Sequence, residues 1–502
     1  MRRRSISSTD RIISSIIILE VLVIMGLIFL LFFYPNNNDS KIKLINRILP
    51  LPNRNLQLPN SNNSNRMVPI GALPFLKTSG QDIVNQNGEK VFLRGVNYGN
   101  WLLWEGCGFG ILDCASYPEY KLKEEMYKRI GYEKTEQFFD LILDNFIQED
   151  DFERVKDLDM NFVRLGFHYR YVKEDQLTLL DEAVSWAKEA GVYVILNMHA
   201  APGAQAPTYF ADSDGNAYLW ESFDYQEQYL DLWKILATRY KDESIVAGYE
   251  ILNEPVANTN QQLTDLYIKT VDLIRNIDNN HIIFLDGNDL ASDFTALDHN
   301  FGDNIVYVFH TYIETQAGLE AIVNNFNYYG YREKYQVPLM CNEYAYFSYN
   351  NYFEDNNINW APWTYKALYA APPLYSMPEG NLWRNWIENL NSNYNKSLIS
   401  SQQQFIDIVQ NSNLSAGARQ DIIDLILAKD TEGLKYGLTQ LQQTYPLEAG
   451  ELENVYTQIK SLAAELKYAA DADWLDDFTA SINNMSDTEL NSLMQSLQTR
   501  YW

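Results

Sequence analysis

The sequence predicts an α/β protein whose main domain is a TIM (β/α)8 barrel. Two observations support this fold: eight short runs rich in apolar, β-branched and aromatic residues, and amphipathic helical segments between them. Apolar strands that alternate with helices indicate a parallel sheet covered on both faces, and eight such units indicate closure into a barrel. The predicted strands span residues 91–96, 161–167, 192–198, 246–252, 281–285, 305–309, 337–341 and 358–361.

Helical segments such as 179–190, 225–240 and 261–277 have the apolar spacing of helices that cover a barrel. Only a short crossover separates Glu343 from the last predicted strand, so the seventh helix is expected to be short or absent. We assign residues 75–395 to the barrel, a fold that uses about 250 residues or more. The β signals stop after this point, and residues 396–502 are predicted to form a helical extension that packs on the barrel.

The amino-terminal region predicts a membrane anchor. Four arginines precede a mostly apolar run of 23 residues at 12–34, which only Glu20 interrupts. This length suffices to cross a hydrocarbon core of about 30 Å, and no Ala-x-Ala cleavage pattern follows. Because basic residues come before the run, we expect a cytoplasmic tail at 1–11, a transmembrane signal anchor at 12–34 and a disordered Asn-rich linker at 35–74. The barrel domain is then extracytoplasmic, or secreted if the segment is cleaved.

Composition excludes one class of partner. The formal net charge is -27, so the protein repels phosphate backbones and is not expected to bind nucleic acid. The chain has 35 Tyr and 11 Trp, which suits a surface that stacks on flat ligands as well as a Tyr-rich core. Of the three cysteines, Cys107 and Cys114 can pair across a short loop or stay free thiols, so cysteine usage leaves the compartment open.

Two glutamates stand at predicted strand ends, where the catalytic residues of a TIM barrel lie. Strand four ends in Asn253-Glu254-Pro255, and strand seven ends in Asn342-Glu343-Tyr344. Both ends face the same bowl, so the two carboxyls can flank one glycosidic bond. Cleavage of an acetal needs this pair, because one carboxyl protonates the leaving oxygen and the other attacks the anomeric carbon or activates water.

Other polar residues occupy the same end of the barrel. Alternation along strand two points Arg164 and His168 the same way, and Arg164 can keep a nucleophilic carboxylate ionised. Asn253 can donate to a sugar 2-hydroxyl, whereas Glu250 is interpreted as a paired structural acid. The remaining candidates are a histidine after strand three, two residues that can position the acids and one flat face for a pyranose ring: His199, His310, Tyr312 and Trp363.

The sequence indicates no cofactor and no metal. The five histidines lack HExxH spacing and do not cluster with cysteines, which argues against a metal hydrolase. There is no Gly-x-Ser-x-Gly elbow, no GxGxxG after a strand and no P-loop.

The chain resembles glycoside hydrolase family 5, the cellulase family, over roughly residues 75 to 390. The matching phrases are RGVN at 94–97, NFVR at 161–164, MHAAPG at 198–203, LNEP at 252–255, HTY at 310–312, NEY at 342–344 and WTYK at 363–366. The resemblance implies a TIM barrel, retention of anomeric configuration and no cofactor. It implies Glu254 as acid/base and Glu343 as nucleophile, with supporting roles for Arg164, His199, Asn253, His310, Tyr312 and Trp363.

Within the family, residues 94–101 and the Ala-Pro-Gly after His199 are similar to the exo-β-1,3-glucanase-like branch, whereas Asn342 departs from the Gly or Thr common before the nucleophile. The expected function is retaining hydrolysis of a β-linked polysaccharide, with β-glucan or a related oligosaccharide as partner. The alternatives are a membrane-associated glycolipid glycosidase and a non-catalytic carbohydrate-binding barrel. Linkage, exo or endo action, hydrolysis or transglycosylation, and oligomeric state are not determined by these patterns.

Overall fold

The computed structural model describes residues 73–111, 114–173, 177–368, 373–400, 402–427, 441–442 and 444–499. The chain divides into two compact units, one built around residues 73–391 together with the described residues from 476 onward, the other around the described residues between 392 and 475. The first unit holds the barrel, and the second holds helices only.

The barrel consists of eight parallel strands in the order β10-β9-β8-β7-β6-β5-β4-β3. A parallel bridge between Arg94 and Trp360 and a hydrogen bond from Trp360 N to Leu93 O (3.1 Å) join the first strand to the last. All residues of the eight strands are buried, as expected for a sheet covered on both faces. The predicted TIM barrel is therefore confirmed. Its strands are β3 (Gly95–Leu102), β4 (Phe162–His168), β5 (Tyr193–Ala200), β6 (Val246–Glu250), β7 (Ile282–Asp286), β8 (Ile305–Thr311), β9 (Leu339–Tyr344) and β10 (Ile358–Trp360).

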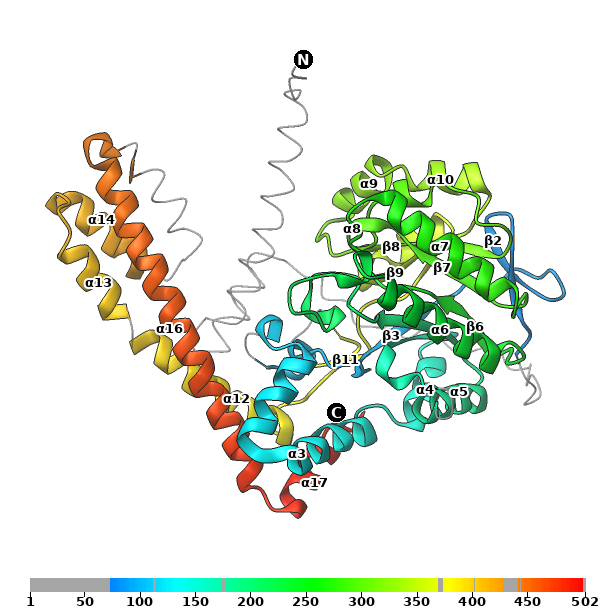
Figure 1. Cartoon of the computed structure of the whole chain (residues 1–502), viewed down its shortest axis with the longest axis horizontal. Coiled ribbons are helices and arrows are strands. Elements are labelled where there is room, and N and C mark those ends of the chain that lie inside the picture. Colours follow the sequence, from blue (N-terminus) through cyan, green and yellow to red (C-terminus); the bar gives the residue numbers. More distant parts are fainter. Residues whose placement is uncertain are drawn as a thin grey trace, which may run out of the picture. The chain divides into compact units, whose positions relative to one another are not determined.

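Helices follow the strands and cover the barrel (Figure 1). Their ends carry recognisable caps: Ser222 and Thr259 accept hydrogen bonds at the starts of α6 and α7, and Gly191 ends α5 in the left-handed region. The short seventh crossover contains a 3-10 helix at Phe347–Tyr349 and the six-residue α11. The helices are α3 (Glu119–Phe146), α4 (Glu149–Asp157), α5 (Thr178–Ala190), α6 (Phe223–Tyr240), α7 (Asn260–Arg275), α8 (Asn288–Ala291), α9 (Gln316–Asn325), α10 (Tyr328–Tyr335) and α11 (Asn350–Asp355).

The predicted first strand at 91–96 is wrong by several residues. An antiparallel hairpin of β1 (Leu76–Ser79) and β2 (Asp82–Asn85) precedes the barrel, and Val91 N bonds to Ile83 O (2.9 Å). Leu76 and Ile83 of this hairpin join the apolar core of the barrel. The first barrel strand instead runs on through small and polar residues that hydrophobicity does not mark. Gly95 fits there because a Cβ would lie 2.4 Å from the Phe162 ring.

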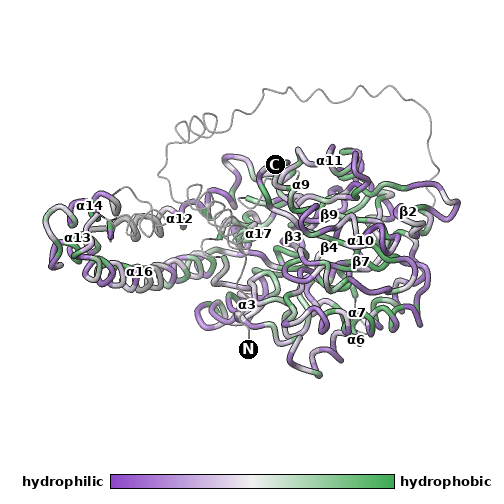
Figure 2. Tube along the Cα trace, turned by 90° about the horizontal axis from the view of Figure 1, so that it is seen from above, coloured by the Kyte–Doolittle hydropathy of each residue, from purple (hydrophilic) through white to green (hydrophobic). Residues whose placement is uncertain are grey.

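The helical part of the chain contributes to both units. It contains α12 (Leu382–Ser400), α13 (Gln402–Gln410), α14 (Ala416–Leu427), α16 (Ala449–Asn484) and α17 (Asp487–Gln495). The second unit has its own apolar core, formed by Val409, Leu414, Ala418, Ile422, Leu441, Leu452, Val455 and Ile459. Residues 476–499, which the sequence analysis assigned to the extension, lie in the barrel unit. Figure 2 shows hydrophobic and hydrophilic stretches alternating along these helices.

None of the helices formed by the described residues combines the length and the apolar character that a membrane crossing requires. The expected anchor at 12–34 lies outside the described residues, as does the linker up to residue 72. The anchor therefore stays a sequence-based prediction.

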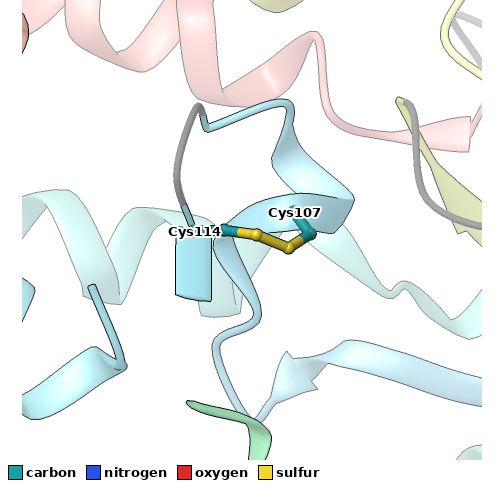
Figure 3. The surroundings of a disulfide bond; sticks show 2 residues. All are labelled: Cys107 and Cys114. Atoms are coloured by element: carbon teal, nitrogen blue, oxygen red, sulfur yellow. A yellow bond between two sulfur atoms is a disulfide. The ribbon is translucent and has the colours of Figure 1, made fainter. Parts of the chain in front are cut away.

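Cys107 and Cys114 form a disulfide, with their Cα atoms 5.2 Å apart (Figure 3). The pair closes a loop between β3 and α3. Of the two arrangements that the sequence allows, the structure therefore has the bridged one. The third cysteine, Cys341, is a buried free thiol on β9.

Candidate active site

The two predicted glutamates meet at the carboxyl end of the barrel. Glu343 lies on β9, and Glu254 lies four residues beyond the end of β6. His310, on β8, bridges them: its Nδ1 is 2.7 Å from Glu254 Oε1 and 3.5 Å from Glu343 Oε2. One oxygen of each carboxylate and this ring nitrogen all lie within 4.8 Å of one another. Since both carboxylates are almost fully buried, a ligand between them is largely shielded from water.

Arg164, on β4, is a fully buried cation whose side chain links β4 to residues of β3, β6 and β9. Its guanidinium donates to both oxygens of Glu250 (2.7 and 2.6 Å) and to Glu343 Oε1 (2.7 Å). It also donates to Asn97 Oδ1 (2.8 Å) and Asn253 Oδ1 (2.5 Å). Every side of the buried charge therefore has an acceptor, as a buried ion needs. The interpretation of Glu250 as a paired acid agrees with this contact.

Electrostatics separate the two glutamates. Burial alone would raise the pKa of Glu343, yet the positive charges of His310 and Arg164 lower it to about 2. Burial raises the pKa of Glu254, and the negative charge of Glu343 raises it further, against the hydrogen bond with His310. Burial would lower the pKa of His310, but the two carboxylates raise it to about 9. The site thus holds an ionised carboxylate, Glu343, beside a carboxyl that retains its proton to higher pH, Glu254. Two neighbouring carboxyls with pKa values shifted in opposite directions can act as nucleophile and as proton donor.

A second buried acid holds the backbone of Glu254. This glutamate has a φ of 42°, in the left-handed region that residues with a side chain rarely adopt. Its N–H donates to Asp286 Oδ2 (2.9 Å), at the end of β7. Burial and the neighbouring charge of Glu250 raise the pKa of Asp286 well above its ordinary value. The sequence does not mark Asp286 as a site residue, because a single aspartate at the end of a strand is common for purely structural reasons.

His199 and Trp363 form one wall. Their rings stack with centroids 5.3 Å apart, and the Trp363–Thr364 peptide bond is cis. Gly99 makes room for the indole, because a Cβ there would lie 2.4 Å from it. His199 Nε2 is 3.3 Å from Asn253 Nδ2 and 3.5 Å from Glu105 Oε1.

Glu105 is a buried acid of the site that the sequence analysis missed. Burial raises its pKa, and the contact with His199 opposes that shift. It follows the end of β3 by three residues, so it would have stood out as a strand-end carboxyl had the first strand been placed correctly.

Tyr312 contacts the carboxylate cluster, whereas His168 does not. Tyr312 donates its hydroxyl to Glu343 Oε2 (3.0 Å) and is 38% exposed, which places it at the mouth of the site. His168 instead contacts Asp212 Oδ2 (3.0 Å) and accepts from Arg170 N. The register of β4 against β5 shifts between Phe167 and His168, so simple alternation does not carry this side chain into the carboxylate cluster. In the described contacts, the His168 side chain holds the loop that contains Asp212.

Among the residues that the structure describes, two groups could geometrically hold a metal ion: Glu250, Asp286 and His310, and Glu254, His310 and Glu343. In both groups Arg164 already contacts one of the carboxylates, Glu250 or Glu343, at 2.6–2.7 Å. A divalent cation there would face this guanidinium, so the donor set suits a proton-transfer site better than a metal centre.

Comparison with known proteins points to one family. Residues 127–370 match the model described as cellulase (glycosyl hydrolase family 5). A β-xylosidase from Phanerodontia chrysosporium is 34% identical over 256 residues, which cover 48% of this chain and 52% of that protein. A probable glucan 1,3-β-glucosidase A from Aspergillus fumigatus is 31% identical over 219 residues, or 40% of this chain and 51% of that protein. An endoglucanase C from Acetivibrio thermocellus is 32% identical over 180 residues, or 34% of this chain and 51% of that protein. The chain thus spans about half the length of the curated relatives it matches.

Proposed function

The chain belongs to glycosyl hydrolase family 5, and from that premise we propose that it hydrolyses O-glycosidic bonds of a β-linked polysaccharide, β-glucan first, with retention of configuration. The observation that carries the proposal is the buried Glu254–Glu343 pair with opposite pKa shifts. Carboxylate oxygens within 4.8 Å of each other favour retention, for which the carboxyls lie about 5–5.5 Å apart, over inversion, for which they lie about 6.5–9.5 Å apart.

The proposed reaction has two displacements. In the first, Glu343 attacks the anomeric carbon while Glu254 gives its proton to the leaving oxygen, so one C–O bond forms as the glycosidic C–O bond breaks. In the second, Glu254 takes a proton from water, whose oxygen displaces Glu343 and restores both carboxyls. Arg164 keeps Glu343 ionised, and His310 holds Glu254 in reach of the leaving group.

The remaining candidates would bind the sugar. Asn253 faces the site with an amide that can donate to a 2-hydroxyl, and the Tyr312 hydroxyl orients the nucleophile. His199 and Trp363 provide a wall whose indole can stack on a pyranose ring. His168 supports this wall only indirectly, through the loop that contains Asp212.

Product analysis tests the proposal. The full chain is incubated with β-1,3-, β-1,4- and β-1,6-glucans, β-mannan, β-xylan and a glycosphingolipid, and NMR follows the anomer first released. Release of the β-anomer from a glucan is the expected result. Release of the α-anomer would overturn retention, and turnover of the glycolipid alone would favour the membrane-associated glycosidase. No turnover of any substrate would favour the non-catalytic carbohydrate-binding barrel. The presence of both carboxyls argues against that alternative. Longer products would indicate a transglycosylase.

The pH dependence of kcat/KM is expected to have a broad acid side and a single fall on the alkaline side. The reaction needs Glu343 ionised and Glu254 protonated. Since the pKa of Glu343 is about 2, acidification through the mildly acid range leaves the nucleophile ionised. Because the pKa of Glu254 is raised, activity falls only as pH rises through that value. Initial rates at low substrate concentration across pH measure this profile, and a fall in rate through the ordinary pKa range of a glutamate on the acid side would contradict it.

Asp286→Ala is expected to lower kcat/KM by about 10- to 100-fold, the scale of losing a positioned catalytic group. The change removes the acceptor for the buried Glu254 N–H, and so it frees the acid from its left-handed conformation. Asp286→Asn keeps an acceptor oxygen and resembles the protonated acid, so it should stay within about threefold of the wild-type rate constant. Both variants are compared by steady-state kinetics on a glucan. Equal losses in the two would show that Asp286 acts through its charge rather than by holding Glu254.

We also propose that the catalytic domain works outside the cytoplasm. The Cys107–Cys114 disulfide supports this location, because disulfides persist in oxidising compartments. The apolar run at 12–34 supports an anchored form. Fractionation of cells that express the full chain, with protease added from outside, tests both points. A protein that is protected from the protease and recovered in the cytosol would overturn the proposal.

A further inference from the structure

Lys366 is a fully buried lysine that the reaction does not use. It lies three residues after Trp363, in β11 (Lys366–Ala367), and is 1% exposed. Its Nζ donates to Leu497 O (3.0 Å) and to Thr499 Oγ1 (2.9 Å), and it lies 3.7 Å from Asp151 Oδ2. Burying an ammonium is costly unless acceptors replace water. These two hydrogen bonds go to residues near the carboxyl-terminal end of the described chain.

The charge of this lysine is retained near neutral pH. Burial lowers the pKa of Lys366 to about 8, and Asp151 opposes that shift. The ammonium also lies over the Phe146 ring, 4.7 Å from its centroid. It therefore keeps all its hydrogens as donors, and the contacts to residues 497 and 499 are charge-assisted.

The residues between Trp363 and Lys366 are bound directly to the site. Thr364 Oγ1 donates to Asn97 O (3.1 Å), and Tyr365 N donates to the same carbonyl (2.9 Å). The side chain of Asn97 in turn accepts from Arg164, which holds Glu343. A shift of this segment would therefore move the indole of Trp363 directly, whereas Glu343 stays held by Arg164, which Glu250 also anchors.

The same segment supports the disulfide loop. Leu368 N donates to Gly108 O (2.7 Å), within the loop that Cys107 and Cys114 close. Glu105, which faces His199, stands two residues before this loop. Residues 363–368 thus include one half of the His199–Trp363 wall and also hold the disulfide loop that follows Glu105.

The carboxyl-terminal residues are themselves held by other contacts in the barrel unit. Ser496 O accepts from Asn381 Nδ2 (2.7 Å), and Ser496 Oγ accepts from Trp383 N (3.1 Å). Gln498 Nε2 donates to Asn145 Oδ1 (2.7 Å). Residues 496–499 are therefore held in place, and Lys366 can attach the segment 363–368 to them.

We propose that Lys366 is a positioning residue that attaches the segment 363–368 to residues 497–499 and so holds Trp363 against His199. The carboxyl-terminal residues then belong to the architecture of the active site and are more than a stabilising extension. The inference rests on the proposed function only for its kinetic consequence, because the attachment itself can be measured without substrate.

The test compares four variants of the full chain with the wild type, two test variants and two controls. Thr499→Val removes one acceptor at nearly constant volume, and Lys366→Met removes the ammonium but keeps most of the stem. Thr499→Ser keeps the hydroxyl and serves as the conservative control. Lys156→Met is a lysine control outside the site: Lys156 is exposed, but its Nζ also donates to a backbone carbonyl, Ala190 O (3.0 Å).

Hydrogen exchange and kinetics are both measured well below the unfolding temperature. We expect peptides covering residues 360–368 and 105–111 to exchange faster in Thr499→Val and Lys366→Met, and unchanged in the two controls. On the best glucan, we expect KM to rise about tenfold in Lys366→Met with kcat lowered less than threefold, because sugar stacking is lost while the carboxyls keep their geometry. Unchanged exchange and KM in both test variants, or the same changes in Lys156→Met, would overturn the proposal. If the wild type turned over no substrate, the proposed function would fail, and the exchange data alone would decide the role of Lys366.

Discussion

Glu343→Gln is expected to abolish turnover of every glycoside substrate. The amide cannot form the glycosyl ester on which the first displacement depends. The loss should be on the order of 10⁴-fold or more, the scale seen when one member of a catalytic unit is removed. The fold should persist, because Arg164 keeps both hydrogen bonds to Glu250 and its contacts to two asparagines.

The variant is compared with Glu354→Gln, a matched control. Glu354 is also paired with an arginine, Arg94, but that pair is partly exposed and lies outside the carboxylate cluster. Steady-state rates on glucan and circular dichroism are measured for both. Mass spectrometry after reaction with a 2-deoxy-2-fluoroglycoside should find the sugar on the peptide that contains residue 343 in the wild type only. A labelled peptide from elsewhere, or a few per cent of residual activity in pure Glu343→Gln protein, would move the nucleophile to another residue.

Glu254→Gln is expected to separate two classes of substrate. On a glucan, whose leaving alcohol must be protonated, kcat should fall by about 10²- to 10⁴-fold, the usual contribution of a general acid. A dinitrophenyl glycoside has a leaving group that needs no proton, so its first displacement should proceed at close to the wild-type rate. The second displacement still lacks its base, and the enzyme should therefore accumulate as the glycosyl ester.

Stopped-flow release of dinitrophenolate gives the measurement: a burst close to one equivalent, followed by slow turnover. Added azide, a nucleophile that needs no general base, should speed the slow phase and yield a β-glycosyl azide. Equal losses on the glucan and the dinitrophenyl glycoside, with no burst, would mean that Glu254 is not the acid. Glu250→Gln is unsuitable as a control, because Glu250 holds Arg164 with both oxygens.

The supporting residues show which side-chain positions the alternation along a strand predicts and which it does not. Period-two alternation placed Arg164 inside the barrel correctly, since β4 is regular up to Phe167. The same alternation did not place His168 correctly, because the register of β4 against β5 shifts between Phe167 and His168. Hydrophobicity located seven strands within a few residues but set the first one early, because β3 buries Asn97 and Asn100 where the pattern expects apolar residues. The same displacement concealed Glu105.

By itself, the sequence determined the alternation of strands and helices, the barrel that follows from it, and the two glutamates at the ends of strands four and seven. These features are local: they depend on the spacing of apolar residues and on which residue ends each run. Only the tertiary structure decided which glutamate is ionised, because the pKa of each depends on burial and on charges that come from Arg164 and His310, far away in sequence. It also decided that Asp286 holds Glu254 and that residues 496–499 hold Lys366. Such contacts join segments up to a few hundred residues apart, and no local pattern encodes them.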